Sequence, residues 1–154
     1  MKANPVLIEF FLTEVGFQMP QVMVNQYGNY FFQRLLSNCS VNQRLRILSH
    51  IKDHFIEICC DKQGTHTIQT IFDNVTTDLE EDFIGEALRD HVYDLSVDQQ
   101  GTHVIRKVLK TRSSYDNLLA PIFEEIHANL FLLCLNQNGL CVIKIVIELT
   151  TTEW

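Results

Sequence analysis

A twelve-residue segment occurs four times along the 154-residue chain, and this repetition limits the fold more than any other feature. The glycines of the four copies are separated by 36, 37 and 38 residues. Such a period is typical of helical units that stack on their neighbours, so we predict an all-α solenoid. The segments are NQYGNYFFQRLL from Asn25, DKQGTHTIQTIF from Asp61, DQQGTHVIRKVL from Asp98 and NQNGLCVIKIVI from Asn136.

Each segment has the pattern of a capped helix. The Asn or Asp three residues before the glycine can accept hydrogen bonds from the first free N–H groups of a helix. Glycine is a poor helix former, so its place in the first turn indicates the close approach of another helix. Residues three, four, seven and eight after the glycine share one face and form the predicted core stripe. They are Phe31, Phe32, Leu35, Leu36; Thr67, Ile68, Ile71, Phe72; Val104, Ile105, Val108, Leu109; and Val142, Ile143, Val146, Ile147.

Two further helices complete each predicted unit. Apolar residues nine, six and four positions before each glycine predict a short helix that ends just before the cap. Amphipathic stretches at 41–52, 77–90 and 114–128 predict a third helix, and the stretch 4–15 can cap the first unit. We therefore expect ten to twelve helices, no sheet and a single domain. It spans 1–154, with units at about 17–52, 53–90, 91–128 and 129–154, the last one incomplete.

Composition excludes several classes of protein. The net charge of −7 argues against a protein that binds nucleic acid through overall positive charge. No apolar run is long enough to cross a membrane. Cys59, Cys60 and His66 make a poor metal site, because adjacent cysteines on a helix point about 100° apart and no fourth ligand is evident. We expect neither a metal nor a cofactor. The five cysteines lack CxxC spacing and predict reduced, mostly buried thiols of an intracellular protein: Cys39, Cys59, Cys60, Cys134 and Cys141.

The sequence does not predict an enzyme. It contains no GxSxG, GxxxxGK[ST], HExxH or GxGxxG motif. The Thr-His pairs at 65–66 and 102–103 recur in different units, whereas a hydrolase needs one assembled site.

The informative residues are those one, two and five positions after each glycine, because they point away from the core stripe. Positions one and five lie one helical turn apart and can therefore reach the same object. The triplets are Asn29, Tyr30, Gln33; Thr65, His66, Gln69; Thr102, His103, Arg106; and Leu140, Cys141, Lys144.

These motifs resemble the repeats of the Pumilio (PUF) family. GNYFFQ, GTHTIQ and GTHVIR are close to the family pattern, LCVIK is more divergent, and the resemblance covers about residues 17–150. It implies a curved right-handed solenoid of three-helix repeats in which each repeat reads one unpaired RNA base. It also implies a cytoplasmic protein that binds single-stranded mRNA in 3′ untranslated regions. Such a protein would regulate gene expression post-transcriptionally, at the level of translation.

The resemblance assigns a role to each member of the triplets. Positions one and five would contact base edges: Asn29, Gln33, Thr65, Gln69, Thr102, Arg106, Leu140 and Lys144. Position two would stack between bases: Tyr30, His66, His103 and Cys141. Asn29 with Gln33 resembles a uracil reader and Thr65 with Gln69 an adenine reader. Thr102 with Arg106 has no clear counterpart, and Leu140 with Lys144 is expected to be permissive. The RNA runs antiparallel to the protein in the family, which predicts 5′-N-N-A-U-3′.

Charge is unevenly distributed along the chain. The four recognition helices carry six basic and two acidic residues, or +4, which leaves −11 elsewhere. We interpret the acidic third helix as a solvated outer face, so an acidic protein can still present a basic inner face. The basic residues of the recognition helices are Arg34, Arg106, Lys107, Lys110, Arg112 and Lys144, and their acidic residues are Asp73 and Glu148. The acidic residues of the third helix are Asp78, Glu80, Glu81, Asp82, Glu86 and Asp90.

The alternative is a helical-repeat protein-interaction scaffold whose RNA readout is degenerate or lost. Leu140, Cys141 and the absence of glutamine at position five in two units favour it, whereas the first two triplets oppose it. The family usually has about eight repeats, and this chain has four. The chain is then a fragment, a truncated form, or half of a homodimer that buries the open end. Protein partners would bind the convex face.

Overall fold

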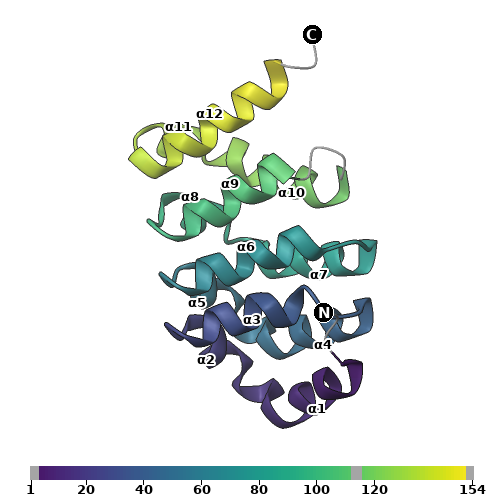
Figure 1. Cartoon of the computed structure of the whole chain (residues 1–154). Helices are drawn as coiled ribbons and strands as arrows, with labels where there is room; N and C mark the ends of the chain where they lie inside the picture. The colour runs from purple at the N-terminus through teal and green to yellow at the C-terminus, as the bar shows by residue number, and fades with distance from the viewer. Residues whose placement is uncertain (1–3, 112–115, 152–154) are drawn as a thin grey trace.

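The computed structural model describes residues 4–111 and 116–151, which form helices and no β-strand (Figure 1). The predicted stretch 114–128 and Arg112 therefore fall partly or wholly outside the described residues. The elements are α1 (Pro5–Val15), η1 (Gly16–Gln18), α2 (Met19–Val24), α3 (Gly28–Leu36), α4 (Val41–Ile51), η2 (Lys52–His54), α5 (Phe55–Cys59), α6 (Gly64–Asn74), α7 (Asp78–Leu88), α8 (Val92–Val97), α9 (Gly101–Thr111), α10 (Asp116–Ala128), α11 (Leu130–Cys134) and α12 (Gln137–Thr151).

The helices stack in chain order as repeated units. Helices α3, α6, α9 and α12 each contact the next and form one row, while α4, α7 and α10 form a second row (Figure 1). The short helices α2, α5, α8 and α11 each pack on the row helix that follows them. This arrangement confirms the predicted all-α solenoid.

The predicted caps begin the helices of the first row. The side-chain oxygen of Asn25 accepts hydrogen bonds from the backbone N–H groups of Tyr27 and Gly28, both at 2.9 Å. Its carbonyl accepts the first helical bond from the N–H of Asn29 at 3.1 Å. Asp61, Asp98 and Asn136 make the equivalent bonds in the other units. Four identical caps therefore start the four helices that carry the triplets.

The repeated glycines allow the short helix of the same unit to approach closely, as the sequence predicts. A Cβ at Gly28 would lie 2.6 Å from the carbonyl oxygen of Val22, and a Cβ at Gly139 would lie 2.5 Å from that of Leu133. At Gly64 it would overlap the carbonyl oxygen of Ile58. No side chain fits there without moving the backbone.

Replacement of Gly64 by alanine is expected to destabilise the protein by roughly 1–3 kcal/mol, because the new methyl group must push α5 away from α6. Urea unfolding followed by circular dichroism measures this change. Gly85→Ala is the matched control, because a Cβ there would meet only Leu118 Cδ1 at 3.5 Å. That variant should be neutral or more stable by up to about 1 kcal/mol. Equal losses in both variants would contradict the close-approach argument.

The predicted core stripe is buried except at three positions, of which Val146 is half-buried. Phe31 is 47% exposed, although its ring meets that of Phe11 edge-on at 4.9 Å. Ile147 is 54% exposed. Within the described residues, α12 packs on α8, α9 and α11, without an outer helix equivalent to α4, α7 or α10. The prediction was wrong at these three residues because the stripe is covered fully only where units lie on both sides.

The acidic outer helix is not solvated throughout, which corrects the sequence interpretation. Glu80 of α7 is fully buried and Glu81 is 5% exposed. Arg44 of α4 donates to both carboxylate oxygens of Glu80, at 2.6 and 3.1 Å, and thereby joins consecutive units. Burial alone would raise the pKa of Glu80, but hydrogen bonds from Arg44, Thr76 and Thr77 outweigh it and leave the pKa below its ordinary value.

The cysteines differ from the sequence expectation in their exposure. Only Cys39 and Cys59 are buried, whereas Cys60 and Cys134 are exposed and Cys141 is half-buried. Burial raises the pKa of Cys39 to about 11, so this thiol stays protonated at neutral pH. No helix in 4–111 or 116–151 is long and apolar enough to cross a membrane.

Candidate nucleic-acid interface

The four sequence triplets lie on α3, α6, α9 and α12, which contact one another in that order (Figure 1). Each triplet begins one residue after the capped glycine, so the same helical positions recur from unit to unit. The structure therefore brings the predicted site residues into one row, with one triplet per unit.

Position two of the triplet is the exposed position. Tyr30 is 66% exposed, and His66 and His103 are also exposed. Cys141 is half-buried. Three flat side chains are thus exposed on three consecutive helices, as stacking between bases requires.

Position one is buried in the first three units, which differs from the expectation that it faces outward. Asn29, Thr65 and Thr102 are 1%, 1% and 2% exposed. The hydroxyl of Thr65 donates to the carbonyl of Gln100 at 3.1 Å, and that of Thr102 donates to the carbonyl of Asn138 at 3.5 Å. The two threonines thus bind to the next unit, because consecutive row helices pack closely at this level, whereas Asn29 Nδ2 donates to the carbonyl of Asn25 in its own unit.

Position five lies over position one in the first two units. Gln33 Nε2 donates to Asn29 Oδ1, and Gln69 Nε2 donates to Thr65 Oγ1, both at 3.4 Å. Both glutamines are half-buried. Each pair is thus already assembled one helical turn apart, with the amide of position five as its accessible group.

The third unit is arranged differently. Arg106 Nη2 donates to His103 Nδ1 at 2.7 Å instead of pairing with Thr102. A guanidinium cannot accept, so this nitrogen of His103 must be unprotonated. Burial, the Arg106 charge and His66 all lower the pKa of His103, which favours the neutral ring. The Nε of Arg106 is buried without a hydrogen-bond partner in the described structure.

The fourth unit offers a weaker set of contacts. Leu140 is 40% exposed and Lys144 is exposed on α12. A leucine at position one has no hydrogen-bonding group for a base edge, which agrees with the permissive role expected for this pair.

Two features of the site are not evident from the triplets. Tyr27 is 76% exposed just before α3 and adds a second free aromatic ring to the first unit. The repeat does not reveal it, because Gln63, Gln100 and Asn138 occupy the equivalent position. Asn138 also donates to the carbonyl of Val97 at 3.1 Å, so this position helps to hold consecutive units together.

The basic character of the row is partly neutralised. Lys107 of α9 forms an ion pair with Asp73 of α6 at 2.7 Å. Among residues 4–111 and 116–151, no three His, Cys, Asp or Glu side chains are grouped so that they could hold a metal ion. The row of α3, α6, α9 and α12 therefore presents polar and aromatic side chains that repeat once per unit.

The fold and this row define an α-solenoid with one polar triplet per unit. A model of the Pumilio-family RNA binding repeat matches residues 18–52, 54–84 and 91–127. These matches cover more than half of the chain, so the chain belongs to the Pumilio family of repeat proteins.

Curated relatives are similar across most of this chain. Pumilio homolog 12 of Arabidopsis thaliana is 28% identical over 140 residues, which are 89% of this chain and 23% of that protein. A Pumilio domain-containing protein of Schizosaccharomyces pombe is 30% identical over 143 residues, which are 93% of this chain and 21% of that protein. The chain thus spans about a quarter or less of the length of these relatives.

Solved structures share the fold. A structure of the Puf4 RNA binding domain bound to the HO endonuclease RNA 3′ UTR recognition sequence matches with a TM-score of 0.80 and 25% identity. The match covers 92% of this chain and 47% of that one. The Puf3 RNA binding domain bound to a Cox17 RNA 3′ UTR recognition sequence matches with a TM-score of 0.76 and 25% identity, over 93% of this chain and 41% of that one.

Proposed function

We propose that this chain binds single-stranded RNA and that each unit reads one base. The observation that carries the proposal is the repeated pair of positions one and five beside an exposed flat side chain. Asn29 with Gln33 and Thr65 with Gln69 are preassembled at 3.4 Å, next to Tyr30 and His66. An unpaired base offers both an edge for the amide and a face for the ring.

The burial of position one refines how the bases are read. Thr65 and Thr102 already donate to the next unit, so position five presents the more accessible group in those units. Gln33 and Gln69 would then make the first hydrogen bonds to the base. Asn29, Thr65 and Thr102 would orient the position-five side chain or bind the base after a small shift.

The titles of the similar structures support the class of ligand. Those Puf4 and Puf3 domains are bound to 3′ UTR recognition sequences. By this similarity, the ligand proposed here is the 3′ untranslated region of an mRNA, and the outcome is regulation of translation in the cytoplasm. The proposed preference remains 5′-N-N-A-U-3′, with uracil at Asn29 and Gln33.

Tyr30→Ala is expected to weaken binding of a short RNA ending in AU by roughly 1–3 kcal/mol, because one stacking face is lost. Folding should not change, since the ring is 66% exposed. Fluorescence anisotropy with a labelled oligonucleotide at several salt concentrations measures the affinity.

Asp82→Ala is the control for this measurement, because Asp82 is an exposed residue of α7 in the other row. Its RNA affinity should match that of the unmodified protein. If Tyr30→Ala leaves the RNA affinity unchanged and Asp82→Ala reduces it, RNA binds the row of α4, α7 and α10 instead of the proposed row. Absence of RNA binding at low salt would favour the protein-interaction scaffold.

A further inference from the structure

A groove of about 640 Å³ runs between α5 and α7, in the part of the fold that the proposed RNA row does not use. Leu79, Phe83 and Ala87 follow one another at four-residue intervals along α7, and Ile56 of α5 lies across the groove. Leu79 is 66% exposed, which is high for a leucine in a folded helix. The apolar strip covers about two turns of α7, or about 12 Å.

Carboxylates surround this apolar strip. Asp53 and Glu57 line one side, and Asp82 and Glu86 line the other. Lys52 is the one lysine or arginine in the lining, which has a formal charge of −3 with His91 neutral. Glu57 and Glu86 remain 80% and 63% exposed although they pair with His54 and Arg89. Such exposed pairs are weak, so these carboxylates can exchange partners at little cost.

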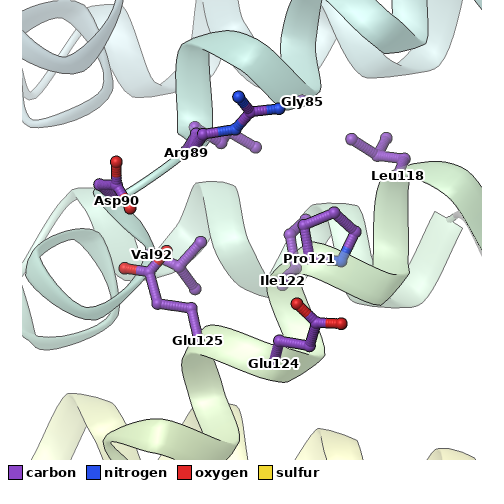
Figure 2. Close-up of a pocket in the computed structure, with 10 residues that line it drawn as sticks. Gly85, Arg89, Asp90, Val92, Leu118, Pro121, Ile122, Glu124 and Glu125 are labelled. Carbon is purple, nitrogen blue, oxygen red and sulfur yellow. The ribbon is translucent and has the colours of Figure 1, made fainter.

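A similar hollow recurs at the next junction between units. Figure 2 shows Leu118, Pro121 and Ile122 of α10 facing Gly85 and Arg89. The hollow that these residues line has a volume of about 380 Å³. Glu124 and Glu125 lie on the same helix, and Asp90 lies on the other side. Leu118 and Ile122 are each only 2% exposed, so this second hollow offers much less apolar surface than the groove at Leu79.

We propose that the groove between α5 and α7 binds a basic amphipathic helix of a partner protein. Leucines at i and i+4 of such a helix would lie on Leu79 and Phe83, and lysines or arginines on either side would meet the four carboxylates. RNA does not fit this surface, because its phosphates would be repelled by the same carboxylates. The proposal is independent of the RNA-binding function of the other row.

The test uses the full chain and two synthetic peptides of 15 residues. Both have leucine at i and i+4 spacing along one face, one with lysine and the other with glutamate at the remaining positions. The lysine peptide is expected to bind in a fluorescence anisotropy titration and the glutamate peptide is not. Equal binding of the two peptides would overturn the proposal.

Leu79→Ser should weaken binding of the lysine peptide roughly tenfold, because the apolar contact is lost. Leu135→Ser is the matched control, since Leu135 is 72% exposed but lies outside the groove, and it should bind normally. Glu57→Lys with Glu86→Lys should also abolish binding while leaving the fold intact, because both side chains are exposed.

Three outcomes would count against a partner helix. Equal loss in Leu79→Ser and Leu135→Ser would show non-specific adsorption. Binding unchanged by the double charge reversal would remove the electrostatic argument. Self-association of the chain alone in sedimentation velocity, abolished by Leu79→Ser, would make a second copy the occupant. RNA affinity measured on the same variants should not change, so failure here is distinguishable from failure of RNA binding.

Discussion

Arg44→Ala is expected to cost about 3–5 kcal/mol of folding free energy, because it leaves the carboxylate of Glu80 buried without its cation. Glu80 is fully buried, and Arg44 supplies two of its hydrogen bonds and also donates to Thr76 and to the carbonyl of Cys39. The pair joins α4 to α7, so its loss weakens the contact between the first two units. Urea unfolding of the variant and the unmodified chain measures the difference.

Arg46→Ala is the matched control for this prediction. Arg46 lies on the same helix and pairs with Glu9, but the two side chains are 39% and 50% exposed, so solvent screens the pair. Its removal should cost at most about 1 kcal/mol. Losses of the same size at Arg44 and Arg46 would contradict the importance of burial.

The dependence on pH has a definite sign. The pKa of Glu80 is lowered in the folded state, so the carboxylate contributes stability above its unfolded pKa. This contribution is lost as the pH falls through the folded pKa. The stability difference between the unmodified chain and Arg44→Ala should therefore be largest near neutral pH and shrink in acid. A difference that stays constant into acid would show that Arg44 acts only through packing.

Ile105→Ala is expected to destabilise the protein by about 2–5 kcal/mol, because it leaves a cavity in a core with units on both sides. Ile105 is fully buried at position four of α9, and α9 contacts both α6 and α12. The change in the urea midpoint at constant slope gives the loss.

Ile143→Ala makes the same chemical change at the same repeat position of α12. Ile143 is 8% exposed, and Val146 and Ile147 beside it are partly and largely exposed. The cavity can fill with water or relax, so the cost should be smaller than at Ile105. An equal cost in both variants would indicate that α12 is covered as fully as α9.

The sequence predicted the helices and their rows because the responsible signals are local and recur four times. The Asx caps and glycines at Gly28, Gly64, Gly101 and Gly139 act within one turn, so a single unit contains all the information. Twelve α-helices in the described residues match the expected ten to twelve.

Contacts between units were harder to predict. Arg44 and Glu80 lie 36 residues apart, and nothing in the hydropathy pattern of α7 distinguishes a buried glutamate from its solvated neighbours. The burial of Thr65 and Thr102 likewise depends on backbone carbonyls of the following unit. The sequence shows which face of a helix a residue occupies, but the distance between adjacent units decides whether that face reaches solvent.

The reading of single bases is tested most directly by exchanging one pair and following every base. In competition binding with RNAs that vary one position at a time, the unmodified chain should prefer U at the last position. The double exchange Asn29→Ser with Gln33→Glu, which resembles the guanine-reading pair of the family, should move the preference at that base alone from U to G. If the unmodified chain binds RNA with C or G at the last position as tightly as RNA with U, the assignment of uracil to Asn29 and Gln33 is contradicted. If the double exchange shifts the preference at any other base, the reading of one base per unit in this register is contradicted.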